Sequence, residues 1–216
     1  DRLLKSVTDR ARTLTQAINV ILALSLPAAA GLVVLGEPII ALLFQRGQFD
    51  ALASRQAGLA LAMYGVGLVG HCVLEIVTRA FYALKDNKPP VLFGVASVIL
   101  NIVLSIVMLP IFATWTPAYF VALALANAIA TTLETAALFV VLMRRYPEIS
   151  LRGTLREFAK STLGSAAMGA VILAWLSAAG RGPLATLGAL AIGGAVYLAA
   201  ALVLKSALLR FRKAQP

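Results

Sequence analysis

Three ionisable side chains at four-residue spacing, His71, Glu75 and Arg79, lie inside a long apolar stretch of the chain. Residues four apart share one face of a helix, so Glu75 and Arg79 can form an ion pair there. Ionisable groups inside a membrane usually face the interior of a helix bundle or a water-filled cavity. The stripe is therefore interpreted either as a gating or substrate-path element or as a structural ion pair that fixes helix packing. For His71 alone, a structural role is preferred over a proton relay.

A second group of polar side chains lies in the next two apolar stretches. Asn101 and Ser105 are one helical turn apart, and Asn127, Thr131 and Glu134 follow the i, i+4, i+7 pattern of one helix face. Amides and hydroxyls inside a membrane join helices by hydrogen bonds. Grouped oxygens can also bind a small cation when enough ligands converge. Interhelical hydrogen bonding is the preferred interpretation, and a coupling cation of unknown identity is the alternative.

Enzymatic chemistry has no recognisable set of residues in this sequence. It contains no Ser/His/Asp set, no glycine-rich phosphate loop and no His/Cys cluster; His71 is the one histidine and Cys72 the one cysteine. Hydrolytic or metal chemistry would need partners that the chain lacks. We expect a protein that is not an enzyme and that carries no metal and no cofactor.

The elements that position these polar groups are six long apolar stretches. They cover about residues 18–43, 56–83, 90–112, 117–142, 160–179 and 184–206. A helix of about 20 apolar residues crosses the hydrocarbon core of a bilayer. The chain is 61% hydrophobic, with a mean hydropathy of +0.91. The sequence therefore predicts an all-α, polytopic transmembrane bundle with six spans.

The basic residues predict how this bundle lies in the membrane. Sixteen of the 19 Lys and Arg residues fall at the termini and on alternate connections, and the other three, Arg46, Arg55 and Arg181, fall on the opposite side. Because cytoplasmic connections carry the excess of Lys and Arg, both ends of this segment are expected in the cytoplasm. The net charge of +10 then reflects topology and contact with anionic lipid head groups, and nucleic acid is not expected as a partner.

Local signals predict how the spans begin, bend and end. Pro27 lies inside the first span, where the missing backbone N–H predicts a kink. Residues 5–16 are polar and are expected to continue the first helix on the cytoplasmic side. In the first outer connection, Gly47 suits a helix stop and Asp50 suits the N-cap of the next helix.

Composition divides the chain into three parts. Residues 1–143, with four spans, are expected to form part of a transporter lobe, and residues 160–216 an appended two-helix hairpin with a basic tail. Between them, residues 144–159 are expected to form a cytoplasmic linker. Within it Leu151, Leu155 and Phe158 recur at helical spacing beside arginines, which favours a short amphipathic helix on the cytoplasmic leaflet over a solvated linker.

The hairpin differs from the other spans in its small residues. Ser165 and Gly169, and Ala189 and Gly193, are pairs at four-residue spacing. Small residues at this spacing let helices approach closely in lipid. Because the hairpin carries almost no polar side chains, we expect these four positions to border an apolar furrow for a lipid tail.

Two stretches resemble a known family. One is Leu42-Leu43-Phe44-Gln45-Arg46-Gly47-Gln48-Phe49-Asp50, and the other is Arg79-Ala80-Phe81-Tyr82-Ala83-Leu84-Lys85-Asp86-Asn87-Lys88-Pro89-Pro90. With Met63-Tyr64-Gly65-Val66-Gly67-Leu68 between them, they resemble the MurJ (MviN) family of lipid II flippases. The resemblance covers the whole chain and matches the last six of the family's fourteen helices. Arg46, Gly47, Phe49, Asp50 and Asp86 are the residues that carry the motif.

The resemblance implies a fold and an activity. The family has two six-helix lobes around a central cavity, and two extra helices that border a lateral hydrophobic groove. It moves a lipid-linked peptidoglycan precursor to the outer leaflet of the bacterial inner (plasma) membrane by alternating access. Some members have a cation site near the equivalents of Asn101, Ser105 and Asn127, where Ser105 replaces an acidic residue. The implied partners are membrane lipids, the precursor and a missing N-terminal half of the same protein.

The sequence is also compatible with two other functions. A related flippase or antiporter of the same superfamily would move a different lipid-linked sugar or a drug. A membrane scaffold without transport would not need the stripe of His71, Glu75 and Arg79 in a cavity.

Overall fold

Six long helices make up the fold in a computed structural model, which describes residues 2–47, 49–115, 118–146, 151–204 and 206–207. They are α1 (Arg2–Phe44), α2 (Ala51–Ala83), α3 (Lys88–Trp115), α4 (Val121–Arg145), α5 (Leu151–Ala179) and α6 (Pro183–Val203). Within the described residues each of the six is long and apolar enough to cross a membrane. The predicted all-α class and the six spans are confirmed.

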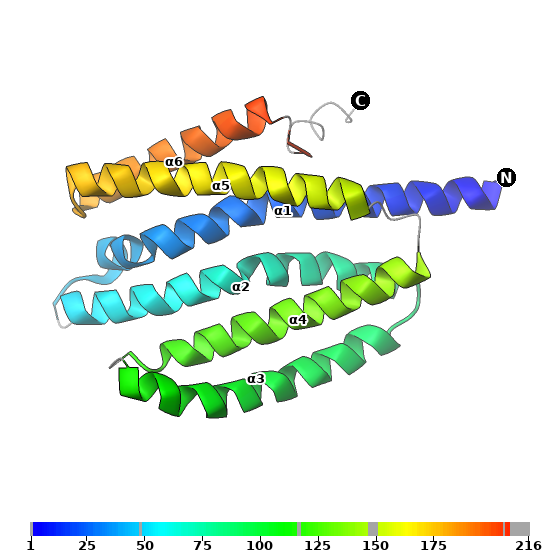
Figure 1. The fold of residues 1–216 in the computed structure, drawn as a ribbon, viewed down its shortest axis with the longest axis horizontal. Coiled ribbons are helices and arrows are strands. Elements are labelled where there is room, and N and C mark those ends of the chain that lie inside the picture. Colours follow the sequence, from blue (N-terminus) through cyan, green and yellow to red (C-terminus); the bar gives the residue numbers. More distant parts are fainter. Residues whose placement is uncertain (1, 48, 116–117, 147–150, 205, 208–216) are drawn as a thin grey trace.

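The first helix is longer than its apolar span. α1 has 43 residues, which corresponds to about 65 Å, roughly twice the hydrocarbon core of a bilayer. Figure 1 shows its N-terminal end projecting beyond the other helices. The expected polar continuation of this helix over residues 5–16 is therefore confirmed. α1 remains helical through Pro27 and Pro38, and its second half departs from the line of its first half in Figure 1.

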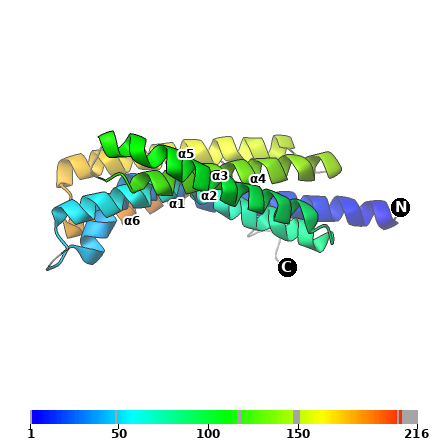
Figure 2. The ribbon, with the colours of Figure 1, turned by 90° about the horizontal axis from the view of Figure 1, so that it is seen from below.

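The helices form two groups that share α1. On one side α1 packs on α2, α2 on α4, and α4 on α3; on the other side α5 and α6 pack on each other and on α1. Figure 2 shows α5, α4 and α3 on one side of the α1–α2 pair, with α6 on the other. α3 lies at the edge, and none of the residues in its most apolar window is buried.

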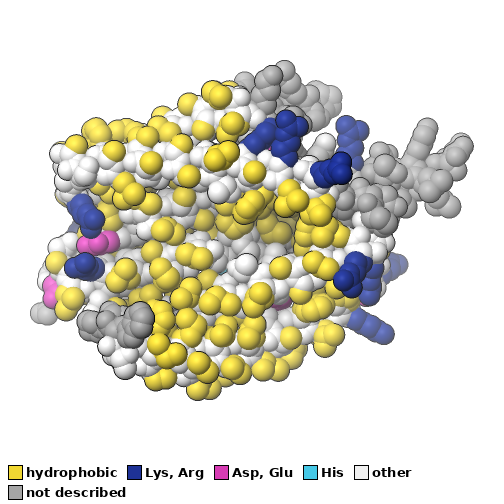
Figure 3. Space-filling view, in the orientation of Figure 1, with side chains coloured by type: hydrophobic (Ala, Val, Ile, Leu, Met, Phe, Trp, Pro, Cys, Tyr) yellow, Lys and Arg dark blue, Asp and Glu magenta, His cyan; other side chains and the backbone are white. Residues whose placement is uncertain are grey.

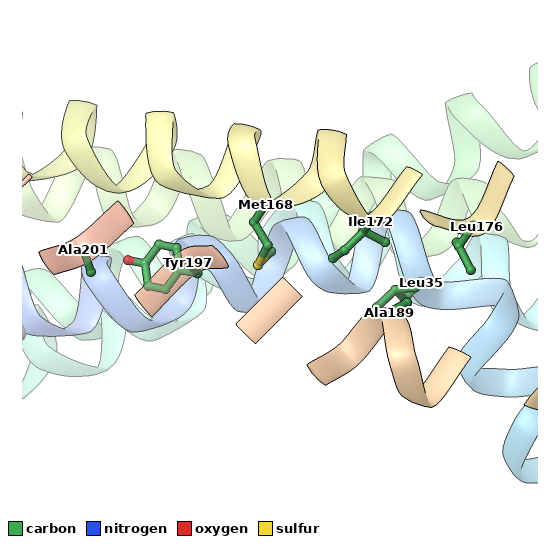
Figure 4. Close-up of a cluster of buried hydrophobic side chains, with 7 residues drawn as sticks. All are labelled: Leu35, Met168, Ile172, Leu176, Ala189, Tyr197 and Ala201. Carbon is green, nitrogen blue, oxygen red and sulfur yellow. The ribbon is translucent and has the colours of Figure 1, made fainter. Parts of the chain in front are cut away.

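Each group has its own apolar cluster. Figure 4 shows the cluster between α1, α5 and α6, which contains Leu35, Met168, Ile172, Leu176, Ala189, Tyr197 and Ala201. The second cluster lies toward the start of α1 and the ends of α2 and α4, and contains Ala11, Val77, Phe81, Leu138 and Leu142. Each cluster therefore draws on α1, which is the element that joins the two groups.

The connections follow the local signals in the sequence. Gly47 has a φ of +56°, in the left-handed region that favours glycine, and it follows the end of α1. Asp50 caps α2, because its carboxylate accepts a hydrogen bond from the Ala53 backbone N–H at 2.8 Å. Asp86, in the turn between α2 and α3, forms an ion pair with Arg145 at the end of α4. The predicted helix stop at Gly47 and the predicted N-cap at Asp50 are confirmed.

The expected separate helix on the membrane surface is wrong. α5 begins at Leu151, so Leu151, Leu155 and Phe158 belong to the first turns of one helix of 29 residues. No proline interrupts the run from Leu151 onward, and extending an existing helix adds a backbone hydrogen bond for each residue fixed. Arg144 and Arg145 belong to the last turn of α4. The remaining part of the expected linker, 147–150, lies outside the described residues.

Candidate functional site

The ionisable stripe on α2 contains the ion pair that the spacing predicted. Arg79 donates from Nε and Nη2 to Glu75 Oε1, at 3.0 and 2.6 Å. Both side chains lie on the surface of the described chain, with 72% of Arg79 and 64% of Glu75 exposed. The pair is thus confirmed as a contact within one helix, and no described side chain covers it.

The position of this pair on a membrane-length helix constrains its surroundings. Glu75 lies eight residues before the end of α2, about 12 Å along the helix axis. A charged pair on a face turned to hydrocarbon is costly, and such pairs are found facing protein or a water-filled cavity. This face of α2 is therefore a candidate for contact with water or with further polar groups.

His71 extends the stripe toward α4. Its Nε2 lies 3.4 Å from Nδ2 of Asn127, so two candidate residues from different spans meet. The helices approach closely beside this contact, because a Cβ on Gly67 would lie 2.8 Å from the Cα of Ala128. Thr135 adds a link between these helices, since its hydroxyl lies 3.0 Å from the Gly70 carbonyl oxygen of α2 and 2.7 Å from the Thr131 carbonyl oxygen, which share its one proton. Asn127, for which a hydrogen bond between spans was predicted, thus contacts a side chain of another span; its partner His71 was not predicted.

The other polar candidates make contacts in separate places. Ser105 donates to Asn101 Oδ1 within α3, at 3.3 Å. Thr131 is buried. Glu134 is half-buried at the side of α4 that meets α3, where its Oε1 would lie 3.5 Å from a Cβ on Gly94.

These contacts do not assemble a cation site. The Asn101 oxygen accepts from Ser105, whereas the Asn127 amide is directed at His71 on α2. A small cation needs several oxygens converging on one point, and the described contacts do not provide such a cage. Among the described residues there is also no group of three or more His, Cys, Asp or Glu that could hold a metal ion. The described contacts of this group are thus hydrogen bonds between protein side chains, and the coupling cation stays a prediction.

An apolar cavity lies on the opposite side of the α2–α4 pair. Its volume is about 390 Å³, and it is lined by Leu26 of α1, by Val66, Val69, Gly70 and Val73 of α2, by Thr132, Thr135, Ala136 and Phe139 of α4, and by Phe158 of α5. Val73 and Glu75 are two residues apart, so their side chains leave α2 about 200° apart. Figure 3 looks onto this face, where hydrophobic side chains line the region between α5 and α4. α2 thus presents a charged face and an apolar face on opposite sides.

The small residues of the hairpin lie in packed contacts. Ser165, Gly169, Ala189 and Gly193 are all buried. A Cβ on Gly193 would lie 2.6 Å from Cδ1 of Ile172, and one on Gly169 would lie 3.8 Å from Val34 of α1. These positions therefore let α5, α6 and α1 approach one another. Their expected role in binding a lipid tail remains a prediction.

Three of the polar contacts that were not predicted join distant segments near the ends of helices. Glu157 of α5 is buried and accepts hydrogen bonds from the Ser206 hydroxyl and, at 2.7 Å, from the Ala207 backbone N–H. Arg181 donates to Glu37 Oε2 at 3.0 Å and ties the turn between α5 and α6 to α1. The third is the ion pair of Asp86 and Arg145. A single acidic residue among Arg152, Arg156 and Lys160 was the available signal for Glu157.

The motif residues mostly form the connections. Arg46 is exposed, and the Phe49 ring lies 6.2 Å from the Phe44 ring across the turn after α1. Gly47 and Asp50 supply the positive φ and the cap already described. The motif therefore preserves two tight connections, one at each end of α2.

Comparison with known proteins gives consistent matches. The sequence profile of the family described as "Lipid II flippase MurJ" matches residues 5–193. A protein of Rhizobium tropici named "Probable lipid II flippase MurJ" is 34% identical over 174 residues, which cover 80% of this chain and 32% of that protein. A Vibrio cholerae protein of the same name is 31% identical over 202 residues, covering 90% of this chain and 37% of that protein.

A solved structure has the same fold. It is titled "Lipid II flippase MurJ, inward closed conformation", and it superposes with a TM-score of 0.74 at 23% sequence identity. The superposition covers 93% of this chain and 41% of that one. The present chain therefore spans about a third of the length of these sequence relatives.

Proposed function

The chain belongs to the MurJ family of lipid II flippases, a family of multi-pass membrane transporters, and from this we propose that it forms part of a flippase for a lipid-linked peptidoglycan precursor. The full-length protein would move the precursor from the inner to the outer leaflet of the bacterial inner membrane by alternating access. On this proposal, α1 to α4 complete one lobe of the transporter and α5 with α6 form the appended pair. The rest of the same protein supplies the other lobe.

The exposed ion pair of Glu75 and Arg79 is the observation that carries this proposal. A lipid with a charged head group does not cross hydrocarbon unaided, because removing its charges from water is prohibitively unfavourable. A flippase must offer the head group a polar path while the tail stays in lipid. The stripe of His71, Glu75 and Arg79 supplies a charged, outward-facing surface on a span, which suits such a path and is unsuited to lipid.

The apolar side of the same helices supports the other half of this requirement. The cavity between α4 and α5 offers about 390 Å³ lined almost entirely by hydrocarbon, on the side of α2 opposite the ion pair. A lipid tail needs such a surface, whereas the small residues of the hairpin are already in contact with neighbouring helices. We therefore place the tail along the α4–α5 side, with the hairpin as one of its walls.

Substituting Ala136 by Trp would fill the cavity. If this variant flips a long-chain substrate at an unchanged rate, the lipid tail does not occupy this cavity.

The basic residues support an orientation with both ends of the segment in the cytoplasm. Figure 3 shows Lys and Arg gathered toward the end of the bundle where α1 begins and α4 ends. This orientation can be tested in the full-length protein after Cys72 and every other native cysteine have been replaced by Ser. A cysteine at Gln45 should then react with an impermeant thiol reagent outside intact cells, and a cysteine at Asn87 should not. Labelling of both positions from the outside would contradict the orientation.

The function is tested by changing the ion pair in the full-length protein. We expect Glu75→Gln and Arg79→Ala each to lower the rate of precursor translocation in sealed vesicles, with the charge-swapped double variant recovering part of the loss. Because the pair is exposed in the described chain, its removal should change the free energy of unfolding by less than about 1 kcal/mol. A loss of transport at normal expression is therefore the informative result.

Arg55→Ala is the matched control, since Arg55 is an exposed arginine on the same helix near its other end. It should leave translocation unchanged. Full translocation by both single variants of the pair would show that the stripe does not line the path. Failure of the unsubstituted protein to translocate any lipid-linked precursor would instead reject the proposed function itself.

A further inference from the structure

Pro27 removes the N–H that would pair with one backbone carbonyl of α1. In an α-helix the carbonyl of residue i accepts from the N–H of residue i+4. The residue four positions after Ala23 is Pro27, which has no N–H. The Ala23 carbonyl, in the middle of a membrane-length helix, therefore lacks the backbone N–H of residue i+4 next to the expected kink.

A tyrosine from the other end of the chain supplies the missing donor. The hydroxyl of Tyr197, on α6, donates a hydrogen bond to the Ala23 carbonyl. Tyr197 is 6% exposed, so this contact is removed from the surface. Two further prolines lie inside described helices, Pro38 and Pro110, and the described contacts include no side-chain donor to the matching carbonyls of Val34 and Ile106. The pairing at Pro27 is thus specific to this proline.

Three helices fix the position of the tyrosine ring. Its Cε2 and Cδ2 lie 3.3 and 3.5 Å from where a Cβ of Gly164 would stand, so the absence of a side chain at Gly164 on α5 makes room for the ring. The ring belongs to the same buried cluster as Met168 and Ile172 of α5, as Figure 4 shows. Tyr197 thus belongs to α6, its ring packs against Gly164 of α5, and its hydroxyl donates to the Ala23 carbonyl of α1.

An unpaired carbonyl in hydrocarbon has no water to pair with, so the hydroxyl stabilises the bent form of α1 more than it would in a solvated helix. Pro27 separates the part of α1 that contacts Tyr197 from the part that carries Leu35 and Glu37. We propose that Tyr197 is a positioning residue that pairs with the carbonyl freed by Pro27 and so fixes the bend of α1 to the α5–α6 hairpin. A change in this bend then requires a matching movement of the hairpin. This coupling goes beyond the proposed function, because it does not depend on which lipid is moved.

The test is a double-mutant cycle in the purified full-length protein. Tyr197→Phe removes only the hydroxyl, and Pro27→Ala restores a backbone N–H that can pair with the Ala23 carbonyl. We expect Tyr197→Phe to lower the midpoint of thermal unfolding by about 2 °C or more. In the Pro27→Ala background the same change should produce little or no shift, because the carbonyl already has its partner. Tyr64→Phe is the matched control, since Tyr64 is 51% exposed on α2.

A distance measurement separates positioning from stability alone. Spin labels at two exposed positions, Leu43 at the end of α1 and Leu198 on α6, report the distance between the end of α1 and the hairpin once all native cysteines are replaced. Tyr197→Phe should broaden the distance distribution, and adding Pro27→Ala should narrow it again.

Equal effects of Tyr197→Phe in both backgrounds, on the midpoint and on the distances, would overturn the proposal. If Tyr197→Phe alone fails to fold, recovery of folded protein on adding Pro27→Ala supports the proposal, and failure to recover overturns it. Neither result requires a transport assay, so this test and the test of the proposed function are independent of each other.

Discussion

The two groups of helices that share α1 differ in the burial and the hydrogen-bond partners of their polar side chains. In the α1–α5–α6 group, Glu157 and Tyr197 are buried and bonded to partners on other segments. In the group of α1, α2, α3 and α4, His71, Glu75 and Arg79 remain on the surface. Glu75 and Arg79 contact each other within α2, and His71 contacts Asn127 of α4. Glu157 and Tyr197 are therefore satisfied within the first group, whereas the second group presents polar side chains at the surface of the described chain.

The way the helices touch also differs. Large side chains such as Met168, Ile172 and Tyr197 fill the space between α1, α5 and α6. Between α2 and α4 the contact is made by Gly67 against Ala128 and by Gly70 against Thr132, so the backbones themselves lie close together. Side chains can rotate to absorb a change, but a backbone cannot. The α2–α4 contact should therefore tolerate change less well, and it is the contact that positions the candidate site.

The largest expected effect compares these two contacts with the same substitution. Gly67→Ala would place a Cβ 2.8 Å from the Cα and Cβ of Ala128, so α2 and α4 must separate. We expect a loss of about 3 kcal/mol in the free energy of unfolding, at the upper end for overpacking. Gly193→Ala meets the end of the Ile172 side chain, which can change rotamer, and should lose less than half as much. Denaturant unfolding of the purified full-length protein measures both.

Gly194→Ala is the control for this pair, because nothing lies within 4 Å of its added Cβ. It should be neutral or slightly stabilising, since alanine favours the helix over glycine. If Gly67→Ala and Gly193→Ala lower the free energy of unfolding equally, a backbone contact is no less tolerant of an added Cβ than a side-chain contact.

A smaller effect is expected at the buried carboxylate of the hairpin. Glu157→Ala leaves the Ser206 hydroxyl and the Ala207 N–H without their acceptor, which should lower the free energy of unfolding by about 2 kcal/mol. Glu157→Gln keeps an acceptor oxygen and should lose less. Hydrogen exchange should show the end of α6 opening more often in the alanine variant. Unchanged exchange there would mean that this contact does not hold α6 in place.

The smallest effect is expected at the ion pair that joins the hairpin to α1. Glu37 and Arg181 are 38% and 65% exposed, and exposed pairs contribute about 0.2–1 kcal/mol. Arg181→Ala should therefore change the free energy of unfolding by less than about 1 kcal/mol, and added salt should reduce the difference further. A loss as large as that at Gly67 would show that this pair, and not the buried contacts, holds the hairpin on α1.

The sequence by itself determined the features that arise between residues close together along the chain. The six spans follow from runs of apolar residues, and the Glu75–Arg79 pair follows from helical spacing. The cap at Asp50 and the turn at Gly47 are also local, because the atoms that interact are at most a few residues apart. The separate surface helix was mispredicted because the amphipathic pattern of residues 151–158 does not reveal whether the helix ends or continues.

The tertiary structure alone decided which helix faces meet. Apolar residues surround most of each span, so hydrophobicity does not specify which side of α2 packs on α4 or which side of α6 packs on α1. The contact of His71 with Asn127, the pairing of Glu157 with Ser206 and the hydroxyl of Tyr197 on the Ala23 carbonyl all depend on that choice. Such contacts join residues 49 to 174 positions apart, and they form only where the close packing of whole helices brings a donor to an unsatisfied acceptor.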